Sequence, residues 1–75
     1  IVCDNANFQL LDENFTQIQA EVKIRYAHKG AKATVINEKN GKLRIIFEEP
    51  QRAVTSGQFA VAYDGKKLLC SGTII

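Results

Sequence analysis

The residues of this chain that could take part in chemistry are few and widely spaced. Cys3 and Cys70 carry thiols, and His28 is the single histidine. The two cysteines lack a Cys-x-x-Cys spacing, and one histidine cannot complete a recognisable zinc site with them. Because small secreted domains usually carry four or more cysteines, the pair favours reduced thiols in an intracellular chain. A disulfide between the two ends of the chain is the second interpretation.

Other catalytic patterns are also missing from the sequence. Glu48 and Glu49 are adjacent, so on a strand they would point to opposite faces and could not act as an acid and base pair. Ser71 lies outside any G-x-S-x-G elbow. The chain carries neither a G-x-x-x-x-G-K-[ST] loop nor a G-x-G-x-x-G fingerprint. We therefore expect no catalytic, cofactor-binding or metal-ligating residue in this segment.

Length and composition indicate one small folded domain, residues 1–75. The chain has 75 residues, of which 45% are hydrophobic and 24% are charged, as in ordinary globular proteins. No apolar run approaches the roughly 20 residues that a membrane-spanning helix needs, so we expect no membrane partner. The sequence contains no methionine. We expect it to be a piece cut from a longer protein.

Alternation of apolar and polar residues at a period of two predicts strands from residue 21 onward. Val22 and Ile24 share one face of the first strand, and Phe59, Val61 and Tyr63 share one face of a later strand with small residues opposite. The predicted strands cover residues 21–26, 33–37, 42–47 and 58–63 and an apolar run from residue 68.

Turn residues join these strands into hairpins. Asn40-Gly41 supplies the positive φ angles of a type I′ turn, and Asp64-Gly65 predicts a second turn. Pro50 ends a strand because it cannot donate to the ladder. Gly72 interrupts the last apolar run and predicts a bulge or a close backbone approach.

These elements predict an all-β fold, a small closed or nearly closed antiparallel β-barrel of about six strands. Closure removes exposed strand edges and lets one small core serve every strand. Residues 6–20 show no capped helical pattern, and residues 7–11 could form either a short strand or an apolar tether. We expect residues 1–19 to be an irregular lead-in and residues 20–75 to form the barrel strands.

Positive charge is concentrated in the middle of the chain. The net charge is +2, yet residues 21–46 hold seven Lys or Arg against two Glu, a balance of +5. This block predicts either a surface that faces phosphates or a solvated face of a sheet.

Four short motifs resemble the C-terminal region of the tRNA-specific 2-thiouridylases. Residues 52–65, RAVTSGQFAVAYDG, resemble that family's RAVTPGQ-x-x-V-x-YDG segment, with Ser56 in place of the proline. Residues 22–28 resemble its K-x-RY-x-H strand, and residues 47–50 resemble its F-[DE]-x-P strand ending. Gly72 falls where the family has a glycine triplet, of which two positions are Cys70 and Ser71 here. The matches occur in the family's order and span roughly residues 20–75.

The resemblance implies a C-terminal β-barrel similar to the second domain of translation elongation factors. Enzymes of this family use ATP and Mg²⁺ to activate the wobble uridine of certain tRNAs and replace its 2-oxygen with sulfur from a cysteine persulfide. Their catalytic motifs lie in another region, and Cys3 and Cys70 do not match their working cysteines. The expected partners are tRNA, the neighbouring domains of the same chain and a sulfur-donor protein, in the cytoplasm.

The resemblance also turns the basic block into a candidate RNA-binding surface. Lys23 and Arg25 project from one strand and Lys42 and Arg44 from another, so the four would form one exterior patch if those strands were neighbours. The candidate RNA-binding residues are Lys23, Arg25, Lys29, Lys32, Lys42 and Arg44, and the family-motif turn contains Arg52, Gly57 and Gln58.

Two other interpretations of the chain stay open at this stage. The domain could be purely structural and pack on neighbouring domains without touching RNA. It could also be an unrelated small barrel that binds protein or oligosaccharide.

Overall fold

The computed structural model describes residues 1–12, 14–24, 30–51 and 54–75, and every regular element in them is a β-strand. The described residues include no helix long and apolar enough to cross a membrane. The strands are β1 (Val2–Phe8), β2 (Gln17–Ile24), β3 (Ala31–Lys39), β4 (Lys42–Phe47), β5 (Phe59–Asp64) and β6 (Lys67–Ile74).

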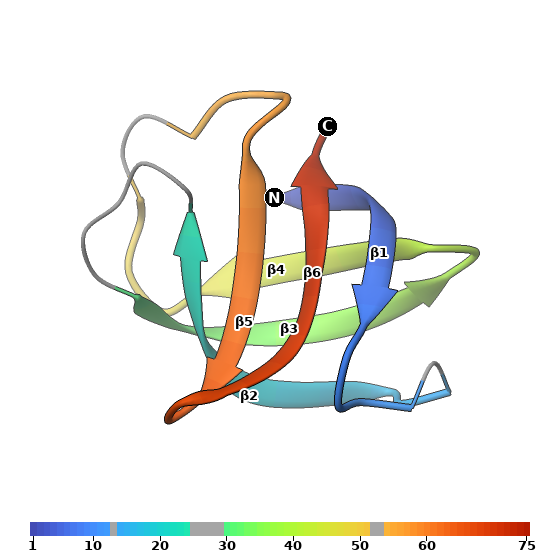
Figure 1. Ribbon diagram of the computed structural model, residues 1–75. Helices are drawn as coiled ribbons and strands as arrows, with labels where there is room; N and C mark the ends of the chain where they lie inside the picture. The colour runs from blue at the N-terminus through green and yellow to red at the C-terminus, as the bar shows by residue number, and fades with distance from the viewer. Residues whose placement is uncertain (13, 25–29, 52–53) are drawn as a thin grey trace.

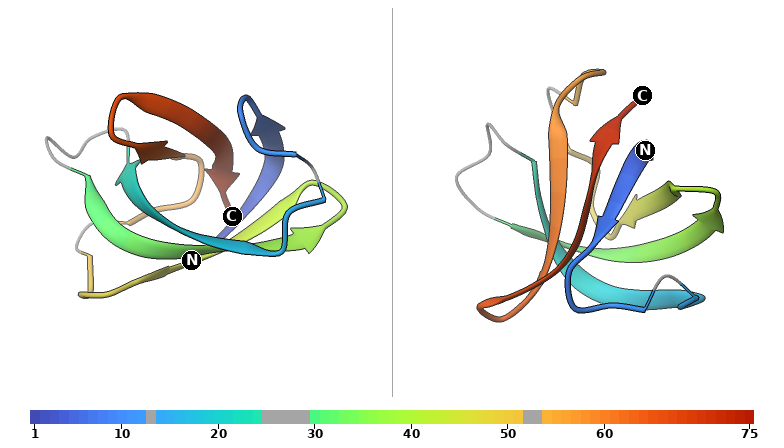
Figure 2. Two further views of the ribbon diagram at one scale, coloured as in Figure 1. Left: turned by 90° about the horizontal axis from the view of Figure 1, so that it is seen from below. Right: turned by 45° about the vertical axis from the view of Figure 1, so that its right-hand side comes forward.

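The strands close into one antiparallel barrel in the order β1-β4-β3-β2-β5-β6 (Figure 1). Pairing between β1 and β6 completes the ring, and Figure 2 shows β5, β6 and β1 side by side, with both chain termini at one end. The predicted all-β closed barrel is therefore confirmed.

The predicted central hairpin is also confirmed. Asn40 and Gly41 have φ angles of 56° and 77° at the turn between β3 and β4. Leu43 and Ile45 of β4 point inward, with 1% and 3% of their surface exposed. Gly65, with φ of 62°, lies in the turn between β5 and β6.

Small side chains fill most of the barrel interior. Barrel diameter grows with strand number, so six strands enclose a narrow space. Leu43 is the largest of the fully buried side chains. The buried core consists of Cys3, Val22, Ile24, Ala33, Val35, Leu43, Ile45, Ala60, Ala62, Cys70 and Ile74.

Strand β5 turns its small residues inward and its large residues outward. Ala60 and Ala62 are buried, with 1% and 3% of their surface exposed, whereas Phe59 is 47% exposed. Val61 and Tyr63, on the same face as Phe59, are only half-buried. The alternation was correctly predicted, but its large face is the outer one because the narrow interior admits the alanines.

The expectation that residues 1–19 form an irregular lead-in is wrong. Residues Val2–Phe8 form β1, which pairs with both β4 and β6, and β2 already begins at Gln17. β1 contains Asp and Asn residues that strands usually disfavour. Its register shifts between Asp4 and Asn7, where Asn5 has a φ of 52°. This segment is therefore a strand because it pairs with β4 and β6, and such long-range pairing cannot be seen in the local sequence.

Gly72 is a point of close backbone approach between β6 and β1. A Cβ placed on Gly72 would lie 2.8 Å from Cβ of Cys3 and 3.3 Å from the carbonyl oxygen of Asp4. The register between β1 and β6 also shifts at this point, because Asp4 pairs with Thr73 and Asn7 with Ser71, so the irregularity in β1 lies opposite Gly72. The close approach predicted for Gly72 is confirmed, and the bulge lies opposite it, on the partner strand β1.

We predict that Gly72→Ala destabilises the protein by about 1–3 kcal/mol, because β6 and β1 would have to separate where the barrel closes. Urea denaturation measures the loss. The neighbouring variant Ser71→Ala is the matched control, since Ser71 is half-buried and lies on the opposite face of the strand. Equal unfolding midpoints for the two variants would contradict the role given to Gly72.

Candidate nucleic-acid interface

The described basic residues of the central block fall into two groups. Lys23 lies on β2 and Lys32 on β3, close to the end where Val22 pairs with Ala31. The second group surrounds the turn between β3 and β4 and contains Lys39, Lys42 and Arg44. Lys39, which was not among the predicted binding residues, joins this group because it pairs directly with Lys42.

The single patch expected from Lys23, Arg25, Lys42 and Arg44 required β2 and β4 to be neighbours. They are not, because β3 lies between them and pairs with each along an opposite edge. Arg44 pairs with Ile36, whereas Lys32 lies near the other end of β3. Arg25 and Lys29 lie outside the described residues. The described cations of residues 21–46 therefore form two separate surfaces.

The hairpin group carries an excess of positive charge. We define the basic hairpin as Glu38, Lys39, Lys42 and Arg44, which together carry three cations and one carboxylate. Nε of Arg44 donates to Oε1 of Glu38 at 2.6 Å, with side-chain exposures of 54% and 37%. An exposed ion pair of this kind is worth at most about 1 kcal/mol, so it leaves the guanidinium available to other anions.

A depression beside the basic hairpin combines an aromatic ring, amide groups and an ammonium group. It has a volume of about 280 Å³. Phe8 in this depression packs edge-on against Phe15, with ring centroids 6.0 Å apart and planes at 66°. The backbone turns here because the Lys39 amide donates to Oδ1 of Asn37 at 2.9 Å. The lining residues are Phe8, Asn14, Asn37, Lys39, Asn40 and Gly41.

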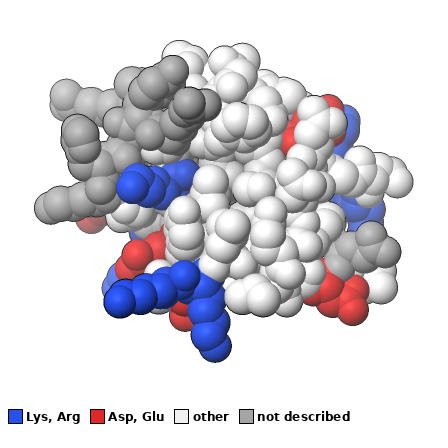
Figure 3. Space-filling model, viewed as in Figure 1, with Lys and Arg blue, Asp and Glu red and all other residues white. Residues whose placement is uncertain are grey.

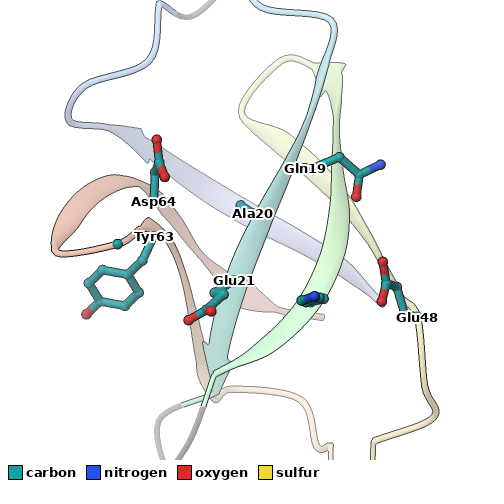
Figure 4. A pocket seen from close by; sticks show the side chains of 8 residues that line it. Gln19, Ala20, Glu21, Glu48, Tyr63 and Asp64 are labelled. Carbon is teal, nitrogen blue, oxygen red and sulfur yellow. The ribbon is translucent and has the colours of Figure 1, made fainter.

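Lys32 has a different electrostatic setting. It lines a groove of about 240 Å³ together with the carboxylates of Glu21, Glu48 and Asp64. In Figure 4, Glu21 lies between Tyr63 and Asp64 on one side and Glu48 on the other. Three carboxylates against one ammonium group make this groove unfavourable for a phosphate.

The family-motif turn is held by hydrogen bonds within the turn and to the backbone of β6. The amide of Thr55 donates to Oε1 of Gln58 at 3.1 Å, and the amide of Gly57 donates to the Ile74 carbonyl at 2.7 Å. Gly57 has a φ of 91° and an added Cβ would meet nothing within 4 Å, so conformation rather than space requires glycine. Gln58 thus stabilises the turn, while Arg52 lies outside the described residues.

Comparison with known proteins assigns this chain to a family. A family model described as "Aminomethyltransferase beta-barrel domain" matches residues 1–74. The chain belongs to this family of β-barrel domains. Its expected kinship with the C-terminal barrel of the tRNA-specific 2-thiouridylases is also confirmed.

Three relatives show the extent of the similarity. The tRNA-specific 2-thiouridylase MnmA of Clostridium botulinum (strain Alaska E43 / Type E3) is 39% identical over 99% of the chain, and that of Nostoc punctiforme (strain ATCC 29133 / PCC 73102) is 44% identical over 95%. The enzyme of Desulfotalea psychrophila (strain LSv54 / DSM 12343) is 50% identical over 77%. The chain spans about a fifth of the length of these relatives, 20%, 20% and 17% respectively.

The cysteines of this 2-thiouridylase barrel domain are buried and unpaired. Cys3 and Cys70 are both free thiols with 0% of their surface exposed. Burial raises the pKa of each to about 11, and the proximity of Cys3 adds to the rise in the pKa of Cys70. The described residues contain no group of three His, Cys, Asp or Glu that could hold a metal ion. The thiols therefore act as small core residues.

We predict that iodoacetamide alkylates neither thiol of the folded protein at pH 8, because both stay protonated and covered. Mass spectrometry after timed quenching measures this, with the urea-unfolded chain as the control. Since the pKa rises on folding from 9.0 to about 11, the unfolded chain loses protons first, and stability should fall as the pH rises through this range. Rapid labelling of either cysteine in the folded protein at pH 8 would contradict this description.

Proposed function

We propose that this chain is a noncatalytic barrel that helps to dock tRNA while the rest of a 2-thiouridylase thiolates the wobble uridine. The similarity to enzymes named tRNA-specific 2-thiouridylase over nearly the whole chain supports a place in such an enzyme. ATP, Mg²⁺ and the sulfur-donor protein would act at the remaining part of that enzyme, in the cytoplasm.

The basic hairpin is the observation that carries the docking role. Its three cations flank an exposed turn, and the adjacent depression offers an aromatic ring and amide groups. Lys and Arg contacts to phosphates position RNA without reading its sequence, while aromatic rings stack on unpaired bases. The hairpin therefore suits a backbone contact with tRNA better than the carboxylate-rich groove around Lys32.

A purely structural role is the alternative. Under it the basic hairpin would only keep the barrel solvated, and its cations would not contribute to RNA affinity. The salt dependence of tRNA binding separates the two roles, because each phosphate contact releases counterions.

We predict that the double variant Lys39→Gln, Lys42→Gln in a full-length 2-thiouridylase carrying this barrel weakens tRNA binding about tenfold at low salt. Each lost phosphate contact should reduce the slope of log affinity against log salt by about 0.7–0.9. Filter binding over a salt series measures both quantities. This variant keeps the ion pair between Arg44 and Glu38 intact.

The matched control is Lys66→Gln, Lys67→Gln, which removes the same charge around the turn between β5 and β6. It should change the affinity and the slope much less. Equal effects of the two double variants would indicate only a general loss of positive charge. An unchanged slope in the hairpin variant would favour the structural role.

A further inference from the structure

Exposed apolar side chains gather at the end of the barrel where the two termini lie. Ile46, Phe59 and Ile75 are 53%, 47% and 58% exposed, and Val2 and Val61 are half-buried. We call these five residues the apolar outer surface. Folded monomers rarely expose apolar patches of this kind unless the patch contacts something.

The pairing of neighbouring strands places these residues close to one another. The amide of Ile75 on the β6 side donates to the carbonyl of Val2 on β1 at 3.0 Å. Val2 pairs with Arg44 of β4, so Ile46 lies two residues along on the same face. Such diagonal neighbours lie within about 7–8 Å.

Strand β5 continues the apolar outer surface on the other side of β6. Phe59 pairs with Thr73, which lies two residues before Ile75 on the same face, and Val61 pairs with Ser71. The five residues therefore lie on or directly after four strands that are consecutive in the barrel, β4, β1, β6 and β5, with the hydroxyl side chains of Ser71 and Thr73 beside Val61 and Phe59.

The centre of this surface is poor in charge, and two exposed cations lie at its edges, where Lys23 pairs with Val61 and Arg44 with Val2. Figure 3 shows a broad area without Lys, Arg, Asp or Glu at the centre of the face formed by β5 and β6, with the charged side chains at its margins. An RNA phosphate finds no cation at the centre of such a surface, whereas the depleted charge and exposed aromatic ring are typical of the core of a protein interface.

We propose that the apolar outer surface docks on the part of a full-length 2-thiouridylase that precedes this barrel. The inference rests on the proposed place of the chain in such an enzyme. About four-fifths of the length of the relatives lies outside the matched segment, which covers 20% of two of them. The nitrogen of Ile1, where a preceding residue would be joined, donates to the carbonyl of Ile45 at 2.9 Å. A preceding residue would thus lie opposite Ile46, inside the apolar outer surface.

Hydroxyl-radical footprinting with mass spectrometry tests this docking, because it measures the solvent access of individual side chains. The oxidation rates of Phe59, Ile46 and Ile75 are compared between the 75-residue chain and a full-length 2-thiouridylase carrying this barrel, both without tRNA. We expect the rates to fall at least about threefold in the full-length enzyme, since the centre of an interface excludes water. Leu10, which is 61% exposed and lies two residues beyond the end of β1, is the internal control and should keep its rate.

Three outcomes would overturn the docking proposal. The first is equal oxidation rates in the chain and the full-length enzyme. The second is protection in the isolated chain that increases with its concentration, which would assign the surface to a second copy. The third is protection that appears only after tRNA is added. The comparison of the chain with the full-length enzyme is made without tRNA, so failure of the domain docking is distinguishable from failure of the docking role for tRNA.

A pair of variants separates an interface from a structural role of the same residues. Phe59→Ser should leave the unfolding midpoint of the isolated chain unchanged, and in the full-length enzyme it should restore the oxidation of Ile75 to the rate of the isolated chain. Leu10→Ser should do neither. Unchanged protection of Ile75 in the Phe59→Ser enzyme would contradict the proposal.

Discussion

The close approach of β6 and β1 is the constraint on which the rest of this structure depends. These strands close the ring, and at their contact a Cβ on Gly72 would lie only 2.8 Å from that of Cys3. A six-stranded ring closed this tightly has room for side chains no larger than Leu43 among those that are fully buried. Small residues such as Ala33, Ala60 and Ala62 therefore occupy inward positions that larger residues fill in wider barrels.

The narrow interior also determines the outer surface. Because β5 directs its alanines inward, Phe59 and Val61 face outward and extend an apolar area beside the two termini. Lys39 and Lys42 lie beside the turn between β3 and β4, whereas Arg44 of the basic hairpin pairs with Val2 and so borders the apolar outer surface. The turn side of this hairpin is thus suited to an anionic partner, and the side of the barrel beside the termini to a protein surface. The two proposals of tRNA docking and domain docking assign a different partner to each side.

Local sequence patterns predicted those parts of the fold whose determinants are themselves local. Asn40-Gly41 specifies the central hairpin because it accepts positive φ angles, and the alternation around Leu43 and Ile45 sets which face is buried. β1 could not be predicted in this way. Its Asp and Asn residues disfavour a strand, and its pairing with β4 and β6 joins segments far apart in the sequence.

The candidate site was predicted only in part for a similar reason. The basic block indicated which residues could meet phosphate, but not that β3 separates Lys23 from Arg44. Charge counting along the chain could not show that three carboxylates surround the Lys32 groove, since Glu21, Glu48 and Asp64 come from distant positions. Lys39 could have been predicted from the sequence as part of the basic hairpin, because a hairpin turn at Asn40-Gly41 places it opposite Lys42.

The division of the outer surface between RNA and protein is the central claim, and a residue-by-residue map of tRNA contact tests it most directly. Amide chemical shifts of the ¹⁵N-labelled chain would be followed during titration with an unmodified tRNA that carries a wobble uridine. The account predicts that shifts concentrate at Lys39, Lys42 and Arg44 and in the depression at Phe8, while Phe59 and Val61 stay unchanged. Shifts confined to Phe59, Val61 and Ile75, or none at the basic hairpin with saturating tRNA, would contradict it.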